Sequence, residues 1–388
     1  MKNVAIFSLA YTPFVGGAEL AIKEITDRLP SDFKFICFTK KFDKKWKDRE
    51  RLGNVSVVRL GLGGTKTKDY YGGPWGKIIY VIRAWRMAEA MHKKEPFSAV
   101  WGMMAAYGGM AAMMFKIRHP RIPFLLTLQE GDSEEHILRR VSVFYPLWKL
   151  IFKKADYIQA ISNFLAEFAE RHGARCPVEI VPNGVAVSGI KGVVAKRKKG
   201  EKIIITTSRL VYKNGIDTLI RAIAELRDGQ MKDVVCNILG TGPDEAKLKK
   251  LVKDLYLEGF VNFLGHVPPS EVEKHLKSAD VFVRVSRSEG LGNSFLEAMA
   301  AGLPVIGTKV GGIPDFLRDP AMVGLTHATG LFARVDNPKD LALKILLLFG
   351  NDELKKHIIR NGKALVLKNY TWETIARRME KIFQKLIK

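Results

Sequence analysis

Residues 279–302 read ADVFVRVSRSEGLGNSFLEAMAAG, in which an apolar strand-like run, a glycine-containing loop and a helical pattern follow one another. Strand-like runs alternate with helical patterns in the same way from the first residues onward, as in NVAIFSLA (3–10), AELAIKEITDRL (18–29) and KFICFT (34–39). This alternation is typical of parallel sheets whose strands are joined by crossover helices. The sequence therefore predicts an α/β fold.

A second series of strand and helix patterns begins at KIIITTSRL (202–210), which indicates a second doubly wound sheet. The 388 residues also exceed the usual size of a single hydrophobic core. A turn dipeptide, Asn183-Gly184, and a run of glycines and lysines separate the two series and have the composition of a connection. We therefore expect an N-terminal domain, a C-terminal domain and a last helix that crosses back to the N-terminal domain, over residues 1–185, 186–368 and 369–388.

The formal net charge is +23, with 63 lysines and arginines against 40 aspartates and glutamates. Such an excess favours an anionic partner, which is nucleic acid, a lipid surface or a phosphorylated substrate. The excess is spread over both halves, since residues 1–185 carry 29 basic and 18 acidic residues, and no nucleic-acid recognition motif accompanies it. We therefore expect no nucleic-acid partner, and a basic nucleic-acid-binding protein is the least favoured interpretation.

The three cysteines, Cys37, Cys176 and Cys236, are scattered and lack the spacing of a metal site. They predict a reducing, cytoplasmic environment and no structural metal. The longest uncharged stretch, residues 97–115, is long enough to span a bilayer, but its glycines favour a strand, a loop and a packed helix. The first apolar run lacks a cleavage-site pattern, so we expect a buried strand there rather than a signal peptide.

A charged loop follows the first strand of the second series. Ser208-Arg209-Leu210 ends that strand, and Lys213 comes just before the next helix. Because open α/β sheets bind ligands at the carboxyl ends of their strands, Arg209 and Lys213 are candidates to clamp a diphosphate and to neutralise its developing charge. A solvated basic loop in a basic protein is the alternative.

Two carboxylates flank the glycine-containing loop of the opening stretch. Glu289 lies in the loop, and Glu297 falls on the first turn of the helix that follows. Carboxylates in such places can accept hydrogen bonds from sugar hydroxyls, while the amides between them face phosphate. Glu297 has an alternative interpretation, because Ser294-x-x-Glu297 is a capping-box pattern.

Glycine pairs mark two further turns between a strand and a helix. Val310-Gly311-Gly312 follows a strand of the second series, and Gly16-Gly17 follows the first strand of the chain. Backbone amides at such turns can approach an anion. Glycine is also used there for turn geometry alone, and the early pair lacks the third glycine of the dinucleotide fingerprint.

With these motifs, the chain resembles the large retaining family of nucleotide-sugar glycosyltransferases of group 1, family 4 type. The family has GT-B architecture, in which two Rossmann-like doubly wound parallel-sheet domains face a central cleft. The resemblance covers nearly the whole chain, and its most specific element is the E-x7-E motif from Glu289 to Glu297. Further matches are the Gly16-Gly17-Ala18-Glu19 turn, the Val181-Pro182-Asn183-Gly184-Val185 hinge and the Tyr370-Thr371-Trp372-Glu373 helix.

The resemblance implies a nucleotide-diphosphate sugar as donor. Arg209 and Lys213 would hold its diphosphate, Glu297 its ribose and Glu289 the transferred sugar, so that Arg209, Lys213 and Glu289 take part in catalysis. The resemblance implies no metal and no other cofactor, because the cations replace a metal and the departing phosphate takes the acceptor proton. The implied donor-binding residues are Gly16, Gly17, Arg209, Lys213, Gly242, Glu289, Gly290, Leu291, Gly292, Asn293, Ser294 and Glu297.

One loop departs from the family pattern. Many relatives carry a histidine near the sugar after the strand FLLTL (124–128), whereas this chain has Gln129-Glu130-Gly131-Asp132. Gln129 can hydrogen-bond the sugar, and Glu130 or Asp132 can orient or deprotonate an acceptor hydroxyl. A polar loop in which Asp132 caps a helix is the alternative.

The N-terminal half of this architecture usually recognises the acceptor, and here basic and aromatic residues are interleaved at 40–51, 75–94 and 137–154. Such segments can lie in an anionic lipid interface, although amphipathic helices packed on a sheet have the same pattern. We therefore expect a cytoplasmic monomer or homodimer, peripheral on the inner face of the membrane. It would transfer a hexose from a UDP- or GDP-sugar to a lipid-linked or cell-surface glycan. The main alternative is a non-catalytic nucleotide-sugar- or carbohydrate-binding protein of the same fold.

Overall fold

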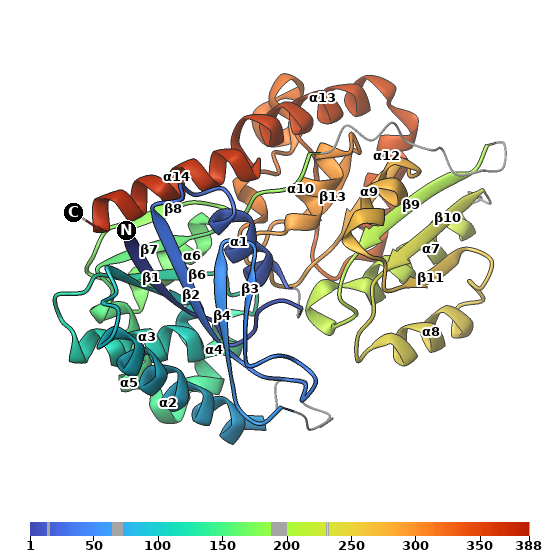
Figure 1. Cartoon of the computed structure of the whole chain (residues 1–388). Coiled ribbons are helices and arrows are strands. Elements are labelled where there is room, and N and C mark those ends of the chain that lie inside the picture. Colours follow the sequence, from blue (N-terminus) through green and yellow to red (C-terminus); the bar gives the residue numbers. More distant parts are fainter. Residues whose placement is uncertain (14–15, 64–72, 188–199, 230, 232, 388) are drawn as a thin grey trace. The chain divides into compact units, whose positions relative to one another are not determined.

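The structure is a computed structural model and describes residues 1–13, 16–63, 73–187, 200–229, 231 and 233–387. The chain forms two compact units (Figure 1). The N-terminal unit consists of Met1–Gly184 and Trp372–Lys388, and the C-terminal unit of Val185–Thr371. The chain thus changes unit after residues 184 and 371, where the sequence suggested 185 and 368. Most of the glycine and lysine run between the units, residues 188–199, lies outside the described residues.

The N-terminal unit contains an eight-stranded sheet with the order β3-β4-β2-β1-β5-β6-β7-β8. Neighbouring strands are parallel except β3 and β4, which run antiparallel. The strands are β1 (Lys2–Phe7), β2 (Phe33–Lys40), β3 (Arg49–Leu52), β4 (Val55–Leu60), β5 (Ala99–Met103), β6 (Phe124–Leu128), β7 (Tyr157–Ala160) and β8 (Val178–Ile180).

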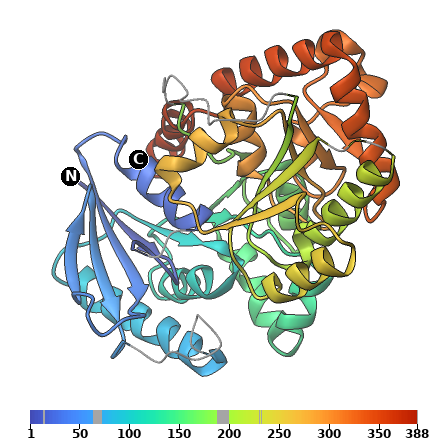
Figure 2. The ribbon, with the colours of Figure 1, turned by 90° about the vertical axis from the view of Figure 1, so that its right-hand side faces the viewer.

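The helices of this unit cover both faces of its sheet. They are α1 (Gly17–Thr26), α2 (Gly73–His92), α3 (Gly109–Arg118), α4 (Glu134–Val141), α5 (Tyr145–Lys154), α6 (Asn163–Arg171) and α14 (Trp372–Leu386), with the short turns η1 (Met104–Gly108) and η2 (Ser142–Phe144). Val4 and Ile6 of β1 share a core with α1 and α14. Phe7 points to the opposite face, where its ring centre lies 6.4 Å from that of Phe115 in α3. On that face α2 (light blue in Figure 2) lies against β2 and β4.

The long uncharged stretch forms part of this fold. Residues 97–115 contain β5, η1 and most of α3, as their glycines indicated. A Cβ atom at Gly108 would overlap the carbonyl oxygens of Met103 and Phe7, so only glycine allows this close approach. No helix in the described part of the chain is long and apolar enough to cross a membrane.

The last helix, α14, packs against the first strands. The ring of Phe383 lies 5.9 Å from that of Phe33, 6.1 Å from that of Phe35 and 5.4 Å from that of Trp101, centre to centre. Aromatic pairs at these distances make favourable contacts in addition to the area that they bury. The chain therefore ends in the unit in which it begins (Figure 1).

The C-terminal unit has a six-stranded parallel sheet with the order β11-β10-β9-β12-β13-β14. Its strands are β9 (Lys202–Thr207), β10 (Val234–Leu239), β11 (Val261–Gly265), β12 (Val281–Arg284), β13 (Val305–Thr308) and β14 (Leu331–Ala333). Its helices are α7 (Ile216–Asp228), α8 (Glu245–Asp254), α9 (Pro269–Lys277), α10 (Asn293–Ala300), α11 (Pro320–Val323), α12 (Pro338–Gly350) and α13 (Asp352–Asn369), with the turns η3 (Tyr212–Asn214), η4 (Ile313–Asp315) and η5 (Leu325–His327).

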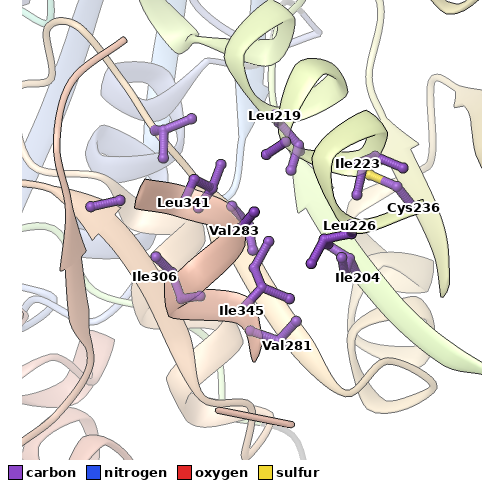
Figure 3. Packing of buried hydrophobic residues seen from close by; sticks show 14 of the residues in the cluster. Ile204, Leu219, Ile223, Leu226, Cys236, Val281, Val283, Ile306, Leu341 and Ile345 are labelled. Carbon is purple, nitrogen blue, oxygen red and sulfur yellow. The ribbon is translucent and has the colours of Figure 1, made fainter. Parts of the chain in front are cut away.

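The core of this unit joins the middle of the sheet to two helices (Figure 3). The strands contribute β-branched side chains, and α7 and α12 contribute residues spaced three and four apart, as amphipathic helices do. Labelled in Figure 3 are Ile204, Leu219, Ile223, Leu226, Cys236, Val281, Val283, Ile306, Leu341 and Ile345. This rigid layer fixes the strand ends from which the charged loops extend.

Candidate functional site

The strand order of the C-terminal sheet reverses between β9 and β12. From β9 the chain proceeds to β10 and β11 on one side, and it then returns to β12 on the other side. Open α/β sheets bind ligands at such a switch point, beside the carboxyl ends of the strands. The loop after β9 carries Arg209 and Lys213, and the loop after β12 carries Glu289. The structure therefore brings these predicted residues to the switch point of one sheet.

Glycines allow the loops at this edge to pack with no side chain between them. A Cβ atom at Gly215, where φ is +66°, would overlap the carbonyl oxygen of Val285. A Cβ atom at Gly242 would overlap the backbone of the loop after β9, and one at Gly311 would overlap the carbonyl oxygen of Glu289. The loops after β9, β10, β12 and β13 are thus in direct contact. Gly242 belongs to this cluster through packing.

Arg284, the last residue of β12, connects the charged loops. Its Nη2 lies 2.5 Å from Glu289 Oε2 and donates to Asn214 Oδ1 at 3.1 Å. Its Nη1 donates to Ser294 Oγ at 2.8 Å. Asn214 Nδ2 in turn donates to the carbonyl oxygen of Arg209 at 2.7 Å. One arginine side chain therefore joins the loop after β9, the loop after β12 and the first turn of α10.

Arg287 fixes the Lys213 segment from the same loop as Glu289. Its backbone amide donates to Lys213 O at 2.7 Å, and its guanidinium lies 4.1 Å from the centre of the Tyr212 ring. Its terminal nitrogens donate to Asp217 at 2.9 and 2.8 Å, and Nη2 also lies 2.6 Å from Asp336. Burial alone would lower the pKa of Arg287, but the two carboxylates outweigh it and raise the pKa above its ordinary value. Arg287, in the loop after β12, thus fixes the segment around Lys213 in the loop after β9.

Glu297 lies on the second turn of α10 rather than on the first. Burial raises its pKa to about 7, and the charge of Arg284 acts in the opposite direction. The predicted capping box is wrong, because the N-cap of α10 is Gly292, with φ of +99°, and Ser294 Oγ accepts from Arg284 instead. Glu297 is therefore a partly buried carboxyl group that does not cap its helix.

The remaining predicted donor residues complete the segment between the two glutamates. Gly290 and Leu291 are buried, Gly292 ends the loop, and Asn293 opens α10 with a partly exposed side chain. The segment from Glu289 onward thus presents both backbone and side-chain polar groups beside Arg284.

Two amides of the glycine loops, those of Gly290 and Gly312, are bonded to Glu289. Gly312 donates to the carbonyl oxygen of Glu289 at 3.3 Å, and Gly290 donates to Glu289 Oε1 at 3.2 Å. The Gly311-Gly312 pair leads into the short turn η4 rather than into a longer helix. The pair therefore packs two loops together, and an amide-lined anion site there stays a prediction.

In the N-terminal unit, Gly16 is the N-cap of α1 and its amide is bonded within the same helix. It donates to Glu19 Oε2 at 2.9 Å, and burial raises the pKa of Glu19. A Cβ atom at Gly17 would lie 4.0 Å from Asn183 Nδ2, an ordinary van der Waals distance. Residues 14 and 15 of the same turn lie outside the described residues. Gly17 therefore lies beside Asn183.

Gln129 follows β6 and pairs with the same asparagine. Gln129 Nε2 donates to Asn183 Oδ1 at 3.1 Å, and Asn183 Nδ2 donates to Gln129 Oε1 at 3.0 Å. The two bonds orient both amides and join the loop after β6 to the segment after β8. Gln129, Asn183 and Gly17 therefore form one polar cluster at the carboxyl edge of the N-terminal sheet.

The other two acidic candidates of this loop have different surroundings. Glu130 is buried, its Oε2 accepts from the amide of Gln129 at 2.9 Å, and its Oε1 accepts from the amide of Ala105. Burial raises the pKa of Glu130 to about 7, although these hydrogen bonds lower it in part. Asp132 does not cap α4, because the N-cap is Ser133, whose Oγ accepts from the backbone of that helix. The suggested cap is therefore wrong, and the contacts of Glu130 favour a structural role.

Sequence reasoning missed four polar residues that hold these clusters together, namely Arg284, Arg287, Asn214 and Asn183. For Arg284 a signal was present, because a charged residue stands near the end of the apolar run ADVFVRVS. A buried charge requires partners, so such a position indicates polar groups close by. Asn183 stood out only as part of a turn and of the family hinge, and Asn214 carries no such signal, since asparagine is common in turns.

Known glycosyltransferase families match the sequence of each unit. Residues 193–365 match the family of glycosyl transferases group 1, and residues 16–184 match a glycosyl transferase 4-like domain. The two matches together cover most of the chain. The chain therefore belongs to the group 1 glycosyltransferases of family 4 type.

Several glycosyltransferases are similar to the chain along much of its length. An uncharacterised glycosyltransferase of Methanocaldococcus jannaschii is 25% identical over 402 residues, covering 99% of each chain. A component of the phosphatidylinositol N-acetylglucosaminyltransferase of Arabidopsis thaliana is 28% identical and covers 87% of this chain and 73% of its own. The GDP-mannose-dependent α-(1-6)-phosphatidylinositol monomannoside mannosyltransferase of Mycobacterium tuberculosis is 29% identical over 58% of this chain and 60% of its own.

Solved structures of low sequence identity share the fold. The sucrose-phosphate synthase of Thermosynechococcus elongatus has a TM-score of 0.82 at 20% identity, over 100% of this chain and 99% of its own. HepE of Anabaena, in complex with UDP-glucose, has a TM-score of 0.75 at 18% identity, over 99% of this chain and 100% of its own. With the two parallel sheets described above, these similarities confirm the predicted GT-B fold.

Proposed function

We propose that the chain transfers a hexose, with retention of anomeric configuration, from a UDP- or GDP-sugar to a lipid-linked or cell-surface glycan. The observation that carries the proposal is the cluster of Glu289 and the Arg209 loop around Arg284 at the switch point of the C-terminal sheet. Cations and carboxylates at one strand edge suit a ligand that has both a diphosphate and sugar hydroxyls.

The proposed roles follow from the chemistry of these side chains. Arg209 and Lys213 hold the diphosphate and neutralise the charge that develops as the sugar leaves. Glu297 accepts hydrogen bonds from the ribose, and Glu289 accepts them from the transferred sugar. The acceptor hydroxyl attacks on the face from which the phosphate departs, and the departing phosphate takes its proton. The two cations replace a metal ion, so transfer proceeds without one.

The names of similar proteins support the choice of donor and acceptor. The Mycobacterium tuberculosis protein is named for GDP-mannose and a phosphatidylinositol mannoside, and the Arabidopsis protein is named for phosphatidylinositol. HepE of Anabaena was crystallised with UDP-glucose. Both nucleotides and a lipid-linked acceptor are therefore the first substrates to test.

A lipid-linked acceptor requires contact with a membrane, and the N-terminal unit has a suitable surface over residues 139–154, here called the α4–α5 surface. Val143 and Phe144 in η2 are 83% and 55% exposed. Arg139 and Arg140 precede them at the end of α4, and α5 ends in two lysines. Exposed apolar side chains between cations suit the interface of an anionic membrane. We propose that this surface gives peripheral contact with the inner face of the cytoplasmic membrane.

The direct test is transfer from UDP-, GDP- and ADP-hexoses to phosphatidylinositol and to a polyprenol-linked monosaccharide, with the product anomer determined by NMR. We expect a UDP- or GDP-sugar to react with retention, in the presence of EDTA, and Glu289→Gln to lower kcat by about 100-fold. Glu258→Gln, an exposed position of the same unit, is the control and should keep full activity. Tight donor binding with neither transfer nor hydrolysis would favour a non-catalytic binding protein.

A further inference from the structure

Strand β12 ends in Arg284, a charged residue at a position where an apolar side chain would pack equally well. Val281, Phe282 and Val283 are fully buried, and the next side chain, Arg284, is only 13% exposed. Placing a guanidinium there costs desolvation free energy that only good partners offset. Its Nε is buried and has no acceptor among the described residues. An apolar residue would avoid this cost, so the arginine calls for a functional explanation.

The contact with Glu289 determines how that carboxylate is presented. Arg284 Nη2 lies 2.5 Å from Oε2, whereas Oε1 accepts a bond of 3.2 Å from the amide of Gly290. Oε2 is buried and has no hydrogen-bond partner among the described residues, so the ion pair with Arg284 is the contact that holds it. A carboxylate oxygen has two acceptor positions, so Oε1 keeps one for a sugar hydroxyl. The Glu289 side chain is itself only 13% exposed. Without Arg284 it would be a largely buried charge that lacks its counter-charge.

Two further contacts connect Arg284 to neighbouring elements. Through Asn214, which is buried, Arg284 is connected to the carbonyl oxygen of Arg209. Through Ser294 it is connected to the start of α10, the helix that carries Glu297. A planar guanidinium can serve these three directions at once, whereas a lysine ammonium on a flexible stem cannot. The three elements thus share one anchor.

We propose that Arg284 is a positioning residue for glycosyl transfer: its guanidinium holds the Glu289 carboxylate and, through Asn214, the Arg209 loop in the arrangement that receives the nucleotide sugar. The inference rests on the proposed function. It assigns to Arg284 no contact with the substrate, since the terminal nitrogens are occupied by protein partners. Its effect on the reaction is therefore transmitted through Glu289 and the Arg209 loop.

The test is a double-mutant cycle on the full chain. We would measure kcat for hydrolysis and for transfer with whichever of UDP-glucose and GDP-mannose the wild type uses, for Arg284→Met, Glu289→Gln and the double variant. We expect Arg284→Met to lower kcat by about 10–100-fold and the double variant to lose much less than the product of the two single losses, because Arg284 acts in large part through Glu289. Arg284→Lys, which keeps the charge, should recover part of the loss.

The controls separate positioning from folding. Arg227→Met removes another partly buried arginine of the same unit, with bonds to the carbonyls of Leu255 and Tyr256, and should lower stability without lowering kcat. If Arg284→Met does not fold, the cycle is made with Arg284→Lys, for which the same non-additivity is expected. Multiplicative losses in the cycle, or a wild-type kcat in Arg284→Met, would overturn the inference and leave the proposed function standing. A wild type that uses no UDP- or GDP-hexose would overturn both.

Discussion

Glu130 Oε1 accepts a hydrogen bond of 2.5 Å from the backbone amide of Ala105, in the turn that follows the neighbouring strand β5. The carbonyl oxygen of Ala105 accepts from Trp148 Nε1 at the same distance. Beside it, Met104 has φ of +65°, a left-handed conformation that costs free energy for a side chain of this size. Buried side chains thus bond both the N–H and the C=O of Ala105 and stabilise an unfavourable stretch of backbone.

The variant Glu130→Gln tests this structural role. The carboxylate now accepts hydrogen bonds from the backbone amides of Ala105 and Gln129. A side-chain amide would instead direct its own N–H groups at one of these two donors. We expect the free energy of unfolding to fall by about 1–3 kcal/mol, the usual cost of leaving a buried polar group unpaired. Urea unfolding measures it, with Glu135→Gln, an exposed position of α4, as the control. A variant of normal stability with slow transfer would instead support a role for Glu130 as a general base.

Glu297 should make stability depend on pH in a defined direction. Burial raises its pKa to about 7, against a charge on Arg284 that lowers it, whereas a glutamate in the unfolded chain titrates near about 4.3. The folded state therefore keeps the proton to higher pH, so this group makes the protein less stable as pH rises from about 4.3 to about 7.

The variant Glu297→Gln removes this titration. At pH 8 we expect its Tm to exceed that of the wild type by about 3 °C, the shift that ~1 kcal/mol produces in a domain of this size. At pH 4 the difference should vanish, and affinity for the nucleoside diphosphate should fall at both values. Thermal unfolding at several pH values measures this, with the exposed Glu258→Gln as control. An equal Tm at pH 8 would contradict the assignment.

Arg287 should matter for both stability and donor affinity. Arg287→Met leaves Asp217 and Asp336 without their shared cation and releases the contact with the Tyr212 ring. We expect a loss of about 2 kcal/mol in the free energy of unfolding, below the range for a fully buried pair, and a KM for the nucleotide sugar raised about tenfold. Arg334→Met breaks a surface pair with Asp340 and should cost less than about 1 kcal/mol. Equal effects of the two variants would be inconsistent with this expectation.

The α4–α5 surface can be tested by vesicle binding. We expect the double variant Val143→Ser/Phe144→Ser to bind phosphatidylserine-rich vesicles about tenfold more weakly, because two exposed apolar side chains are lost from the lipid interface. Vesicle sedimentation measures this affinity. The matched control is Leu343→Ser/Leu346→Ser, which changes two exposed apolar residues of α12 in the other unit. Equal binding by wild type and both double variants would rule out the proposed contact.

Much of the fold and of the C-terminal site follows from local patterns in the sequence. Alternating strand and helix patterns predicted two parallel sheets, and the E-x7-E motif placed Glu289 and Glu297 on a loop and a helix that follow one strand. Both features are local, because strand, loop and helix signals extend over only a few residues. They were therefore accessible without knowledge of tertiary contacts.

What the sequence could not show depends on contacts between distant segments. Arg284 and Asn214 are 70 positions apart, and Gln129 and Asn183 are 54 positions apart, yet each pair is hydrogen-bonded. The capping prediction for Ser294 failed for a different reason, because its partner is only 10 positions away in the sequence. Arg284, the last residue of the preceding strand β12, donates to the hydroxyl that the local pattern assigned to the helix end.

The position of α14 has a consequence for synthesis of the chain. Phe383 covers Phe33, Phe35 and Trp101, but it is translated only after the whole C-terminal unit. The first strands therefore leave the ribosome long before the helix that shields their aromatic face exists. Until residue 383 has been translated, the nascent polypeptide carries an uncovered aromatic surface of the kind that chaperones bind and that aggregates when left bare.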